Sequence, residues 1–536
     1  MRASFHVYDT TLRDGAQQEG MNLSVADKLA IAELLDRLGV GFIEGGWPGA
    51  IPKDTEFFQR LAKEVTLRHA TLAAFGATRK AGAKAAADPQ VRALVEAETP
   101  VVTLVAKSDI RHVERALRTT PEENLAMIRD TVEFLVGQGR RVFLDAEHFF
   151  DGYRFDPAYA LACARAAAEA GAEVVVLCDT NGGMLPPGIG QIVAAAASQV
   201  EAQLGIHCHN DTGCAVANTL AAVQAGAMHV QGTVNGYGER TGNADLTAII
   251  PNLALKAGVA ALSPSQLADL TAVAHAISEV TNIAPFARQP YVGLSAFAHK
   301  AGLHASAIRV DPDLYQHIDP LKVGNDRRML VSEMAGRASV ELKGKELGFD
   351  LAGQDALLAR VTERVKDLEA QGYTYDAADA SFELLLRAEL PQGRPEYFRV
   401  ESWRTISETL GAGLAAPAGK PDPTASEATV KLWAGQRRLV ATGEGNGPVN
   451  ALDAALRLAL EAIYPELAQI DLVDYKVRIL DSATGTDAVT RVMIETTDGA
   501  SVWRTVGVGA NIIEASWEAL TDAFTYGLLR AGVSPR

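Results

Sequence analysis

The sequence is poor in cysteine. Its four cysteines, Cys163, Cys178, Cys208 and Cys214, form no CxxC pair in a chain of 536 residues. Four thiols at these positions are too sparse to cross-link a chain of this length. We therefore expect reduced thiols, as in a cytoplasmic protein.

Long apolar runs and an excess of basic charge are also missing. Nowhere do 18 apolar residues follow one another without a charge, and the N-terminus lacks the apolar core of a signal peptide. The 66 acidic residues outnumber the 50 basic ones, for a net charge of −16, and no dense Lys/Arg run compensates. This balance disfavours a surface for phosphate backbones. We expect a soluble cytoplasmic protein with neither nucleic acid nor membrane as a partner.

The first 262 residues alternate short β-branched runs with Ala-rich amphipathic stretches. Ser24 and Asp27 form a capping-box pattern ahead of the first helical stretch, and Gly39 ends it. Such alternation predicts a parallel sheet with its helices outside. Eight units of this kind are the number in a closed (β/α)8 TIM barrel. The expected strands cover residues 5–9, 41–45, 67–75, 101–106, 141–147, 173–179, 204–209 and 228–232.

A doubly wound open sheet is the alternative for the same pattern. No GxGxxG motif follows the first strand, which weakens the dinucleotide-binding version of that fold. We therefore predict an α/β protein with a catalytic barrel over residues 1–262.

The rhythm changes beyond residue 262. Residues 263–375 are mainly helical in pattern and predict a helical subdomain, with loops around 285–291 and 310–326. A Pro/Gly-rich segment over 411–423 predicts a loop or linker. We expect residues 376–536 to form a C-terminal α+β regulatory domain.

The last hundred residues contain an internal repeat. Gly443-x-Gly445 is matched 64 residues later by Gly507-x-Gly509, and alanines and a leucine follow each copy at equal spacing. Strand-like runs precede each Gly-x-Gly and a helical stretch follows it. The pattern predicts a duplicated module with a groove for a small effector or a dimer interface, and the sequence leaves both open.

Reactive side chains gather where the barrel strands are expected to end, which is the active face of such a barrel. His207 and His209 end the seventh strand two residues apart, so both imidazoles can reach one point. Asp14 lies just past the first strand, which in a closed barrel is near the seventh. These three side chains predict a divalent cation site with open positions for substrate. For the His-x-His pair alone, two hydrogen-bonded core histidines are the alternative.

Four more polar residues should face the same cavity. Arg13 suits a developing oxyanion or a carboxylate, and an ion pair to Glu44 or Asp179 is its structural alternative. An amide oxygen from Asn243, after the eighth strand, could join the metal. Glu147 ends the fifth strand, and Thr180 lies just past the sixth. Each residue alone is more readily structural, so their convergence on one rim carries the prediction.

Five motifs resemble the family of metal-dependent Claisen-condensing enzymes that includes 2-isopropylmalate, homocitrate and citramalate synthases. They are DTTLRDGAQ (9–17), CDTNGG (178–183), GIHCHND (205–211), GERTGNAD (238–245) and HKAGLHASA (299–307). The C-terminal repeat is similar to that family's effector-binding domain. Three further stretches are most similar to longer, citramalate-forming members: FIEGGWP (42–48), RTTPEEN (118–124) and DAEHFFDGY (145–153).

The resemblance implies an acyltransferase that condenses acetyl-CoA with pyruvate and water, giving citramalate and free CoA for isoleucine synthesis. It implies a divalent Mn, Mg or Zn ion as cofactor. It also implies isoleucine as a feedback effector and a homodimer held by the region 376–536, with the helical subdomain completing the active site.

The resemblance assigns roles to individual residues. It implies metal ligation by Asp14, His207 and His209, with Asn243 beside them. It further implies that Arg13 holds the keto-acid oxygen, that Glu147 orients the site, and that substrate contacts come from Gln17 and Thr180.

The same resemblance places acid–base chemistry on acetyl-CoA in the helical subdomain. His304 and Tyr315 match the family's pair, although His299 is an equal candidate on periodicity alone. Ser306 stands where short members of the family carry an acid, so another group would have to orient His304.

Three other functions stay open on the sequence. A 2-isopropylmalate synthase uses 2-ketoisovalerate, and its two extra methyl groups change binding by only about 1–3 kcal/mol each, so pocket size decides. A metal-dependent aldol lyase needs no effector domain, and the region after residue 376 counts against it. A non-catalytic amino-acid sensor leaves the polar barrel rim unexplained.

Overall fold

The computed structural model describes residues 5–408, 426–480 and 488–536. The linker expected over residues 411–423 lies outside these ranges. The chain divides into two compact units. The first runs to Phe297 and includes Ile318–Asp326, and the second comprises Ala298–His317 and Arg327–Arg536.

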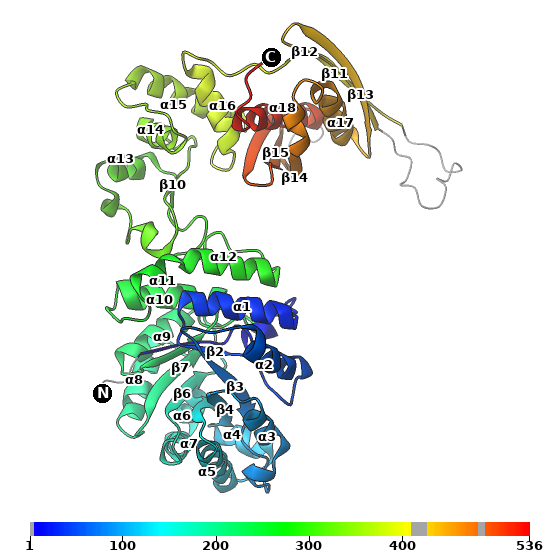
Figure 1. Ribbon diagram of the computed structural model, residues 1–536. Coiled ribbons are helices and arrows are strands. Elements are labelled where there is room, and N and C mark those ends of the chain that lie inside the picture. Colours follow the sequence, from blue (N-terminus) through cyan, green and yellow to red (C-terminus); the bar gives the residue numbers. More distant parts are fainter. Residues whose placement is uncertain (1–4, 409–425, 481–487) are drawn as a thin grey trace, which may run out of the picture. The chain divides into compact units, whose positions relative to one another are not determined.

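In the first unit, eight parallel strands close into a barrel in chain order, and β1 pairs with both β2 and β8 (Figure 1). This confirms the predicted (β/α)8 barrel and excludes the open sheet. The strands are β1 (His6–Asp9), β2 (Phe42–Glu44), β3 (Thr71–Ala77), β4 (Val101–Lys107), β5 (Arg141–Glu147), β6 (Val174–Asp179), β7 (Gln203–Cys208) and β8 (His229–Gly232).

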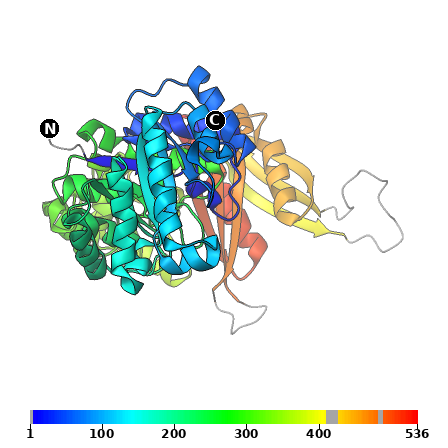
Figure 2. The same cartoon turned by 90° about the horizontal axis from the view of Figure 1, so that it is seen from below.

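The helices of this unit lie around the strands, as a second view shows (Figure 2). The capping box that starts the first helix is formed, because the Asp27 amide donates to Ser24 Oγ and the Ser24 amide donates to Asp27 Oδ2. The helices that follow the eight strands are α1 (Val25–Leu38), α2 (Pro52–Glu64), α3 (Pro89–Glu96), α5 (Pro121–Gly137), α7 (Pro157–Glu169), α8 (Pro186–Ala197), α9 (Ala215–Gln224) and α10 (Leu246–Leu255).

Strand β3 begins four residues later than the pattern suggests. The buried carboxylate of Asp36 accepts hydrogen bonds from the amides of Arg68, His69 and Ala70, which holds this segment as a loop. Short helices α4 (Ile110–His112) and α6 (Phe149–Phe155) also interrupt the loops after β4 and β5, and the hydrophobic pattern did not predict them.

Two helices beyond residue 262 pack with the barrel. They are α11 (Pro264–Ala268) and α12 (Leu270–Thr281), and Leu270, Val273 and Ile277 belong to the barrel's hydrophobic core. The three-part division at residues 262 and 375 stays a prediction, and these contacts place the structural boundary of the first unit later.

The second unit begins with a mainly helical region, as the sequence predicts. A two-stranded sheet of β9 (Ala298–His299) and β10 (Arg328–Met329) accompanies its helices. The helices are α13 (Gly302–Val310), α14 (Arg337–Glu346), α15 (Asp355–Ala370) and α16 (Asp379–Glu389).

Two similar modules form the rest of this unit and confirm the internal repeat. Each has a three-stranded antiparallel sheet followed by a helix. The first contains β11 (Arg399–Ser407), β12 (Ser426–Ala434), β13 (Arg437–Gly445) and α17 (Pro448–Leu460). The second contains β14 (Asp471–Ile479), β15 (Thr490–Thr497), β16 (Val502–Gly509) and α18 (Ile512–Arg530).

The repeated glycines let each helix contact its sheet closely. A Cβ atom on Gly443 would lie 2.3 Å from the amide nitrogen of Ala455, and one on Gly507 would lie 2.1 Å from the carbonyl oxygen of Ala515. Backbone atoms cannot move aside without a large cost in free energy, so both positions require glycine. The two copies of the repeat therefore make equivalent helix–strand contacts.

The structure also shows the state of the cysteines and the apolarity of the helices in the described ranges. The four cysteines, which all lie in the described ranges, are free thiols, and Cys208, between the two histidines in the sequence, is buried. Within those same ranges, the helices fall short of the combined length and apolarity needed to cross a bilayer.

We expect Gly507→Ala to destabilise the C-terminal modules by about 1–3 kcal/mol, because overpacking forces the backbone to shift. Urea unfolding followed by tryptophan fluorescence measures this. Gly509→Ala is the matched control on the same strand, since its Cβ would meet no atom closer than 3.6 Å. Equal stability of the two variants would contradict the close-contact explanation.

Candidate functional site

A cavity of about 790 Å³ opens where the barrel strands end. In a barrel this is the face where loops after the strands meet. The predicted residues that line it are Arg13, Asp14, Gln17, Glu147, Thr180, His207 and His209.

Three of these side chains converge on one point. Asp14 Oδ2 lies 3.2 Å from His207 Nε2 and 3.7 Å from His209 Nε2, and the two Nε2 atoms are 3.3 Å apart. Each side chain therefore offers a ligand atom, all within 4.8 Å of one another. Two imidazoles and one carboxylate with further positions open suit a divalent cation.

Asn243 lies beside this cluster. It pairs with His209 through an isolated β-bridge, and its Nδ2 donates to the Tyr237 carbonyl at 3.0 Å. Its buried Oδ1 has no hydrogen-bond partner among the described residues. An amide held by its nitrogen presents its oxygen as an acceptor, so the residue fits a fourth place at a cation site.

The charges of the cluster are interdependent. Burial opposes ionisation of Asp14, but Arg13 and His207 outweigh it and hold the pKa of Asp14 below its ordinary range. Burial likewise disfavours protonated His207, yet the hydrogen bond to Asp14 raises the pKa of His207 above 6.5. Burial and the neighbouring His207 lower the pKa of His209 to about 4. The three groups together thus favour one bound proton, which carries a single positive charge. A cation can take the place of that proton.

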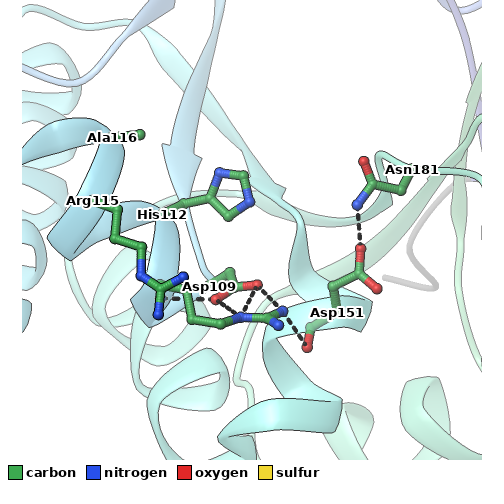
Figure 3. Close-up of a pocket in the computed structure, with 7 residues that line it drawn as sticks. Asp109, His112, Arg115, Ala116, Asp151 and Asn181 are labelled. Atoms are coloured by element: carbon green, nitrogen blue, oxygen red, sulfur yellow. Dashed lines mark hydrogen bonds and ion pairs between the residues drawn. The ribbon is translucent and has the colours of Figure 1, made fainter.

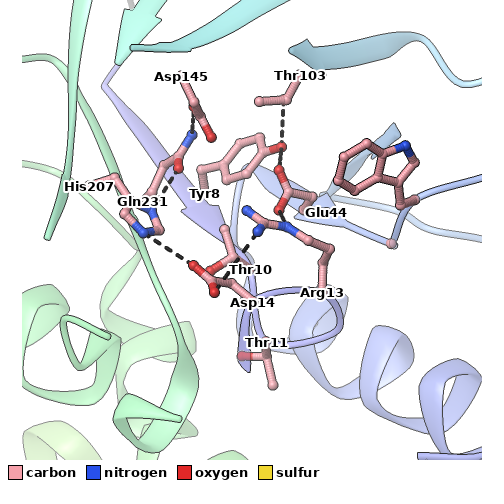
Figure 4. Close-up of polar contacts among 12 residues, drawn as sticks. Tyr8, Thr10, Thr11, Arg13, Asp14, Glu44, Thr103, Asp145, His207 and Gln231 are labelled. Atoms are coloured by element: carbon pink, nitrogen blue, oxygen red, sulfur yellow. Dashed lines mark hydrogen bonds and ion pairs between the residues drawn. The ribbon is translucent and has the colours of Figure 1, made fainter. Parts of the chain in front are cut away.

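Arg13, which lines the cavity, is held in one orientation by its neighbours (Figure 4). Its Nε donates to Glu44 Oε1 at 2.6 Å, and its guanidinium lies 3.8 Å from the centre of the Phe75 ring. Glu44 in turn accepts from the Tyr8 hydroxyl at 2.7 Å. The ion pair with Glu44 foreseen from the sequence is present, and it leaves the terminal guanidinium nitrogens toward Asp14, with Nη1 3.9 Å from Oδ1.

The remaining barrel residues differ in how firmly they are held. Glu147 forms an ion pair with Lys107 on the neighbouring strand β4. Thr180 Oγ1 accepts from the His148 amide at 2.8 Å. Gln17 ends a short 3-10 helix, Gly15–Gln17, and is exposed. Asp9 caps the loop by accepting from the amide and hydroxyl of Thr11.

His304 and Tyr315 belong to the second unit. Their ring centres are 4.1 Å apart, on α13 and just after it. The Ser306 hydroxyl donates to the Gly302 carbonyl at 2.9 Å, so this residue is engaged with its own helix. The ring centre of His299 lies 6.2 Å from that of His304, farther away than the ring of Tyr315.

Sequence reasoning missed two buried polar residues of the cavity region. Gln231 on β8 contacts His207, and Asp145 on β5 contacts Gln231. Asp145 lies two residues before Glu147, and side chains two apart on a strand share a face. That spacing was the available signal for Asp145, whereas nothing local in the sequence marks Gln231.

A second pocket of about 510 Å³ lies on the same barrel unit (Figure 3). Its Arg111 guanidinium pairs with Asp109, and Asn181 Nδ2 donates to Asp151 Oδ2 at 2.7 Å. Two acidic groups thus offset the pocket's arginines, Arg111 and Arg115. This balance of charge favours no ligand class, and we assign it none.

Known families match consecutive parts of the chain. The HMGL-like family matches residues 4–277, the homocitrate synthase post-HMGL domain-like family matches residues 291–373, and the LeuA allosteric (dimerisation) domain matches residues 376–528. Together these matches cover most of the sequence.

Curated proteins are similar over the whole length. The chain is 66% identical to an (R)-citramalate synthase of Streptomyces coelicolor, over 99% of this chain and 98% of that protein. It is 49% identical to an (R)-citramalate synthase of Synechocystis, over 98% and 96% of the two chains. A third (R)-citramalate synthase, from Aquifex aeolicus, is 48% identical over 99% of each.

We expect His207→Ala and His209→Ala each to weaken binding of a divalent cation by more than about 100-fold, since loss of an outer partner alone costs 10–100-fold. Calorimetric titration of the full chain with MnCl₂ measures this, with circular dichroism as a check of folding. His112→Ala is the matched control, because that imidazole lies in the second pocket. Tight binding in either cluster variant would contradict the site.

Proposed function

The chain belongs to the HMGL-like family and, within it, to the (R)-citramalate synthases, and from this premise we propose how its residues condense acetyl-CoA with pyruvate. The reaction joins the two substrates and consumes one water, giving citramalate and free CoA. The observation that carries the proposal is the cluster of Asp14, His207 and His209 at the barrel mouth.

The family is metal-dependent, and these three residues form a cluster able to hold a metal ion. We propose that they bind Mn²⁺, Mg²⁺ or Zn²⁺, with the Asn243 amide oxygen beside them. When bound, such an ion supplies Lewis-acid chemistry that makes the carbonyl carbon of a 2-keto acid electrophilic. The protein's own groups then orient the substrates and manage charge and protons.

Arg13 has the position to stabilise the charge that develops on the keto oxygen. Glu44 and Phe75 fix its guanidinium, so no reorganisation is needed when the ketone becomes an alkoxide. Thr180 lines the same cavity and its hydroxyl can meet the substrate carboxylate, with Gln17 at the rim. Glu147, held by Lys107, lines the same cavity, and we assign it the role of orienting the site.

His304 and Tyr315 are our candidates for acid–base work on acetyl-CoA. Removal of a methyl proton from the thioester gives the enolate that attacks the ketone, and an imidazole is a common general base for such a step. Tyr315 packs on the His304 ring, so it can orient the base in place of the acid that Ser306 replaces. Hydrolysis of the thioester releases CoA and drives the sequence forward.

The acceptor pocket should favour a small keto acid. Apolar side chains occupy part of the cavity wall, among them Phe75, Val105 and Met127. Each methyl group added to the acceptor must be accommodated there, at a cost of about 1–3 kcal/mol when the pocket does not fit it. We propose pyruvate as the acceptor rather than 2-ketoisovalerate, because the relatives that are 48–66% identical to this chain are (R)-citramalate synthases.

We expect free thiol to appear when the purified protein receives acetyl-CoA, MnCl₂ and pyruvate, because CoA leaves with its sulfhydryl. A thiol-reactive dye measures the rate. Replacing pyruvate by 2-ketoisovalerate should slow it by about 10-fold or more, following the methyl cost above. A faster rate with 2-ketoisovalerate would instead identify a 2-isopropylmalate synthase.

The C-terminal region matches an allosteric (dimerisation) domain, and we propose that it joins two copies into a homodimer and binds isoleucine. A pocket of about 660 Å³ lies between the two modules, where the start of α17 faces β14. Backbone amides at a helix start suit a carboxylate, Asp471 suits an ammonium group, and Val449 and Leu472 suit an aliphatic side chain, while Asp453 is paired with Arg457.

We expect isoleucine to inhibit CoA release, and Asp471→Ala to weaken this inhibition at least about 10-fold while basal activity stays unchanged, since a charge-assisted hydrogen bond is worth 1.5–3 kcal/mol. Inhibition curves for isoleucine and leucine measure it. Glu427→Gln, exposed on β12 and outside the pocket, serves as control. Undiminished inhibition of Asp471→Ala would contradict this effector site.

A further inference from the structure

A chain of hydrogen bonds links the metal-site histidine His207 to the buried acid Asp145 through Gln231 (Figure 4). His207 Nδ1 lies 3.0 Å from Gln231 Oε1, and Gln231 Nε2 donates to Asp145 Oδ1 at 2.9 Å. The three side chains come from strands β7, β8 and β5. They are nearly inaccessible to solvent, at 5%, 0% and 4% exposed.

The direction of these bonds determines which nitrogen of His207 carries the proton. A carboxylate only accepts hydrogen bonds, so Asp145 draws the NH₂ end of the Gln231 amide toward itself. The carbonyl end of that amide then faces His207 and accepts a proton from Nδ1. Nε2, which lies against Asp14 and His209, is left with its lone pair free for a cation.

The other histidine of the cluster lacks such a chain. His209 Nδ1 is buried and has no hydrogen-bond partner in the described ranges. Of the two histidines, only His207 therefore has its tautomer and ring orientation fixed by such a hydrogen-bond chain among the described residues. Partners of this kind behind a metal ligand commonly set the ligand's orientation and its basicity.

We propose that Asp145 and Gln231 are positioning residues that hold His207 in the orientation and tautomer needed for metal binding. This inference rests on the metal site of the proposed function. It adds two residues that do not contact the atoms proposed to bind the ion. Asp145 also borders the substrate cavity, so the same acid connects the cavity wall with the metal ligand.

Charge in the surroundings is consistent with this role. Burial and the nearby Glu44 raise the pKa of Asp145 to about 7. The positive charge of a cation at His207 favours the ionised carboxylate. Arg13 acts in the same direction. The bound state is therefore the one in which Asp145 is best able to orient Gln231.

The test measures the Kd for Mn²⁺ on the full chain without substrates, by electron paramagnetic resonance of the free ion. We expect Asp145→Asn and Gln231→Met to raise this Kd by about 10–100-fold. Asparagine at 145 can pair with either end of the Gln231 amide, and methionine keeps the volume of Gln231 without an acceptor. Gln231→Glu should stay close to wild type, because its carboxylate still accepts from Nδ1.

Asp179→Asn is the matched control. It neutralises another buried acid at a strand end, whose carboxylate accepts from the amides of Gly183 and Met184 and takes no part in the chain. It should leave the Kd unchanged, which separates the hydrogen-bond chain from a general effect of buried charge.

Two results would overturn the inference while the metal site stands. One is wild-type affinity in Asp145→Asn and Gln231→Met although His207→Ala no longer binds. The other is equal weakening by Gln231→Met and Gln231→Glu, which would indicate packing alone. If wild type and His207→Ala bind Mn²⁺ equally, or neither binds it, the proposed metal site itself fails and the inference fails with it.

Discussion

The structure depends on bringing one carboxylate and two imidazoles to a single point at the open end of a closed parallel barrel. Asp14 and the histidine pair come from loops and strands nearly 200 residues apart in the chain. Closure of β1 against β8, which in turn pairs with β7, is what makes them neighbours. A sheet that remained open between β1 and β8 would leave the carboxylate without its partners.

The neighbours of this cluster limit its freedom. Glu44 and Phe75 hold Arg13, Tyr237 holds the Asn243 amide, and Gln231 holds His207. Each contact is buried or partly buried, so water competes weakly for it. Groups that are already oriented need little rearrangement when charge develops during a reaction, which is the main electrostatic advantage of an enclosed site.

Much of this arrangement could be predicted from the sequence, because its signals are local or periodic. Alternating strand and helix patterns identified the barrel, and the two-residue spacing of His207 and His209 placed both on one face. The hydrogen-bond chain could not be foreseen, since β5 and β8 meet across the barrel interior and Gln231 looks like any residue of a short buried strand. Likewise, the late start of β3 depends on Asp36, a helix residue more than 30 positions earlier.

The central claim concerns where one divalent cation binds, and anomalous X-ray diffraction from crystals grown with MnCl₂ and pyruvate tests it directly. The account predicts one strong anomalous peak per chain in the barrel cavity, in contact with Asp14, His207 and His209. A peak at other residues, with these three side chains left free of metal, would contradict it.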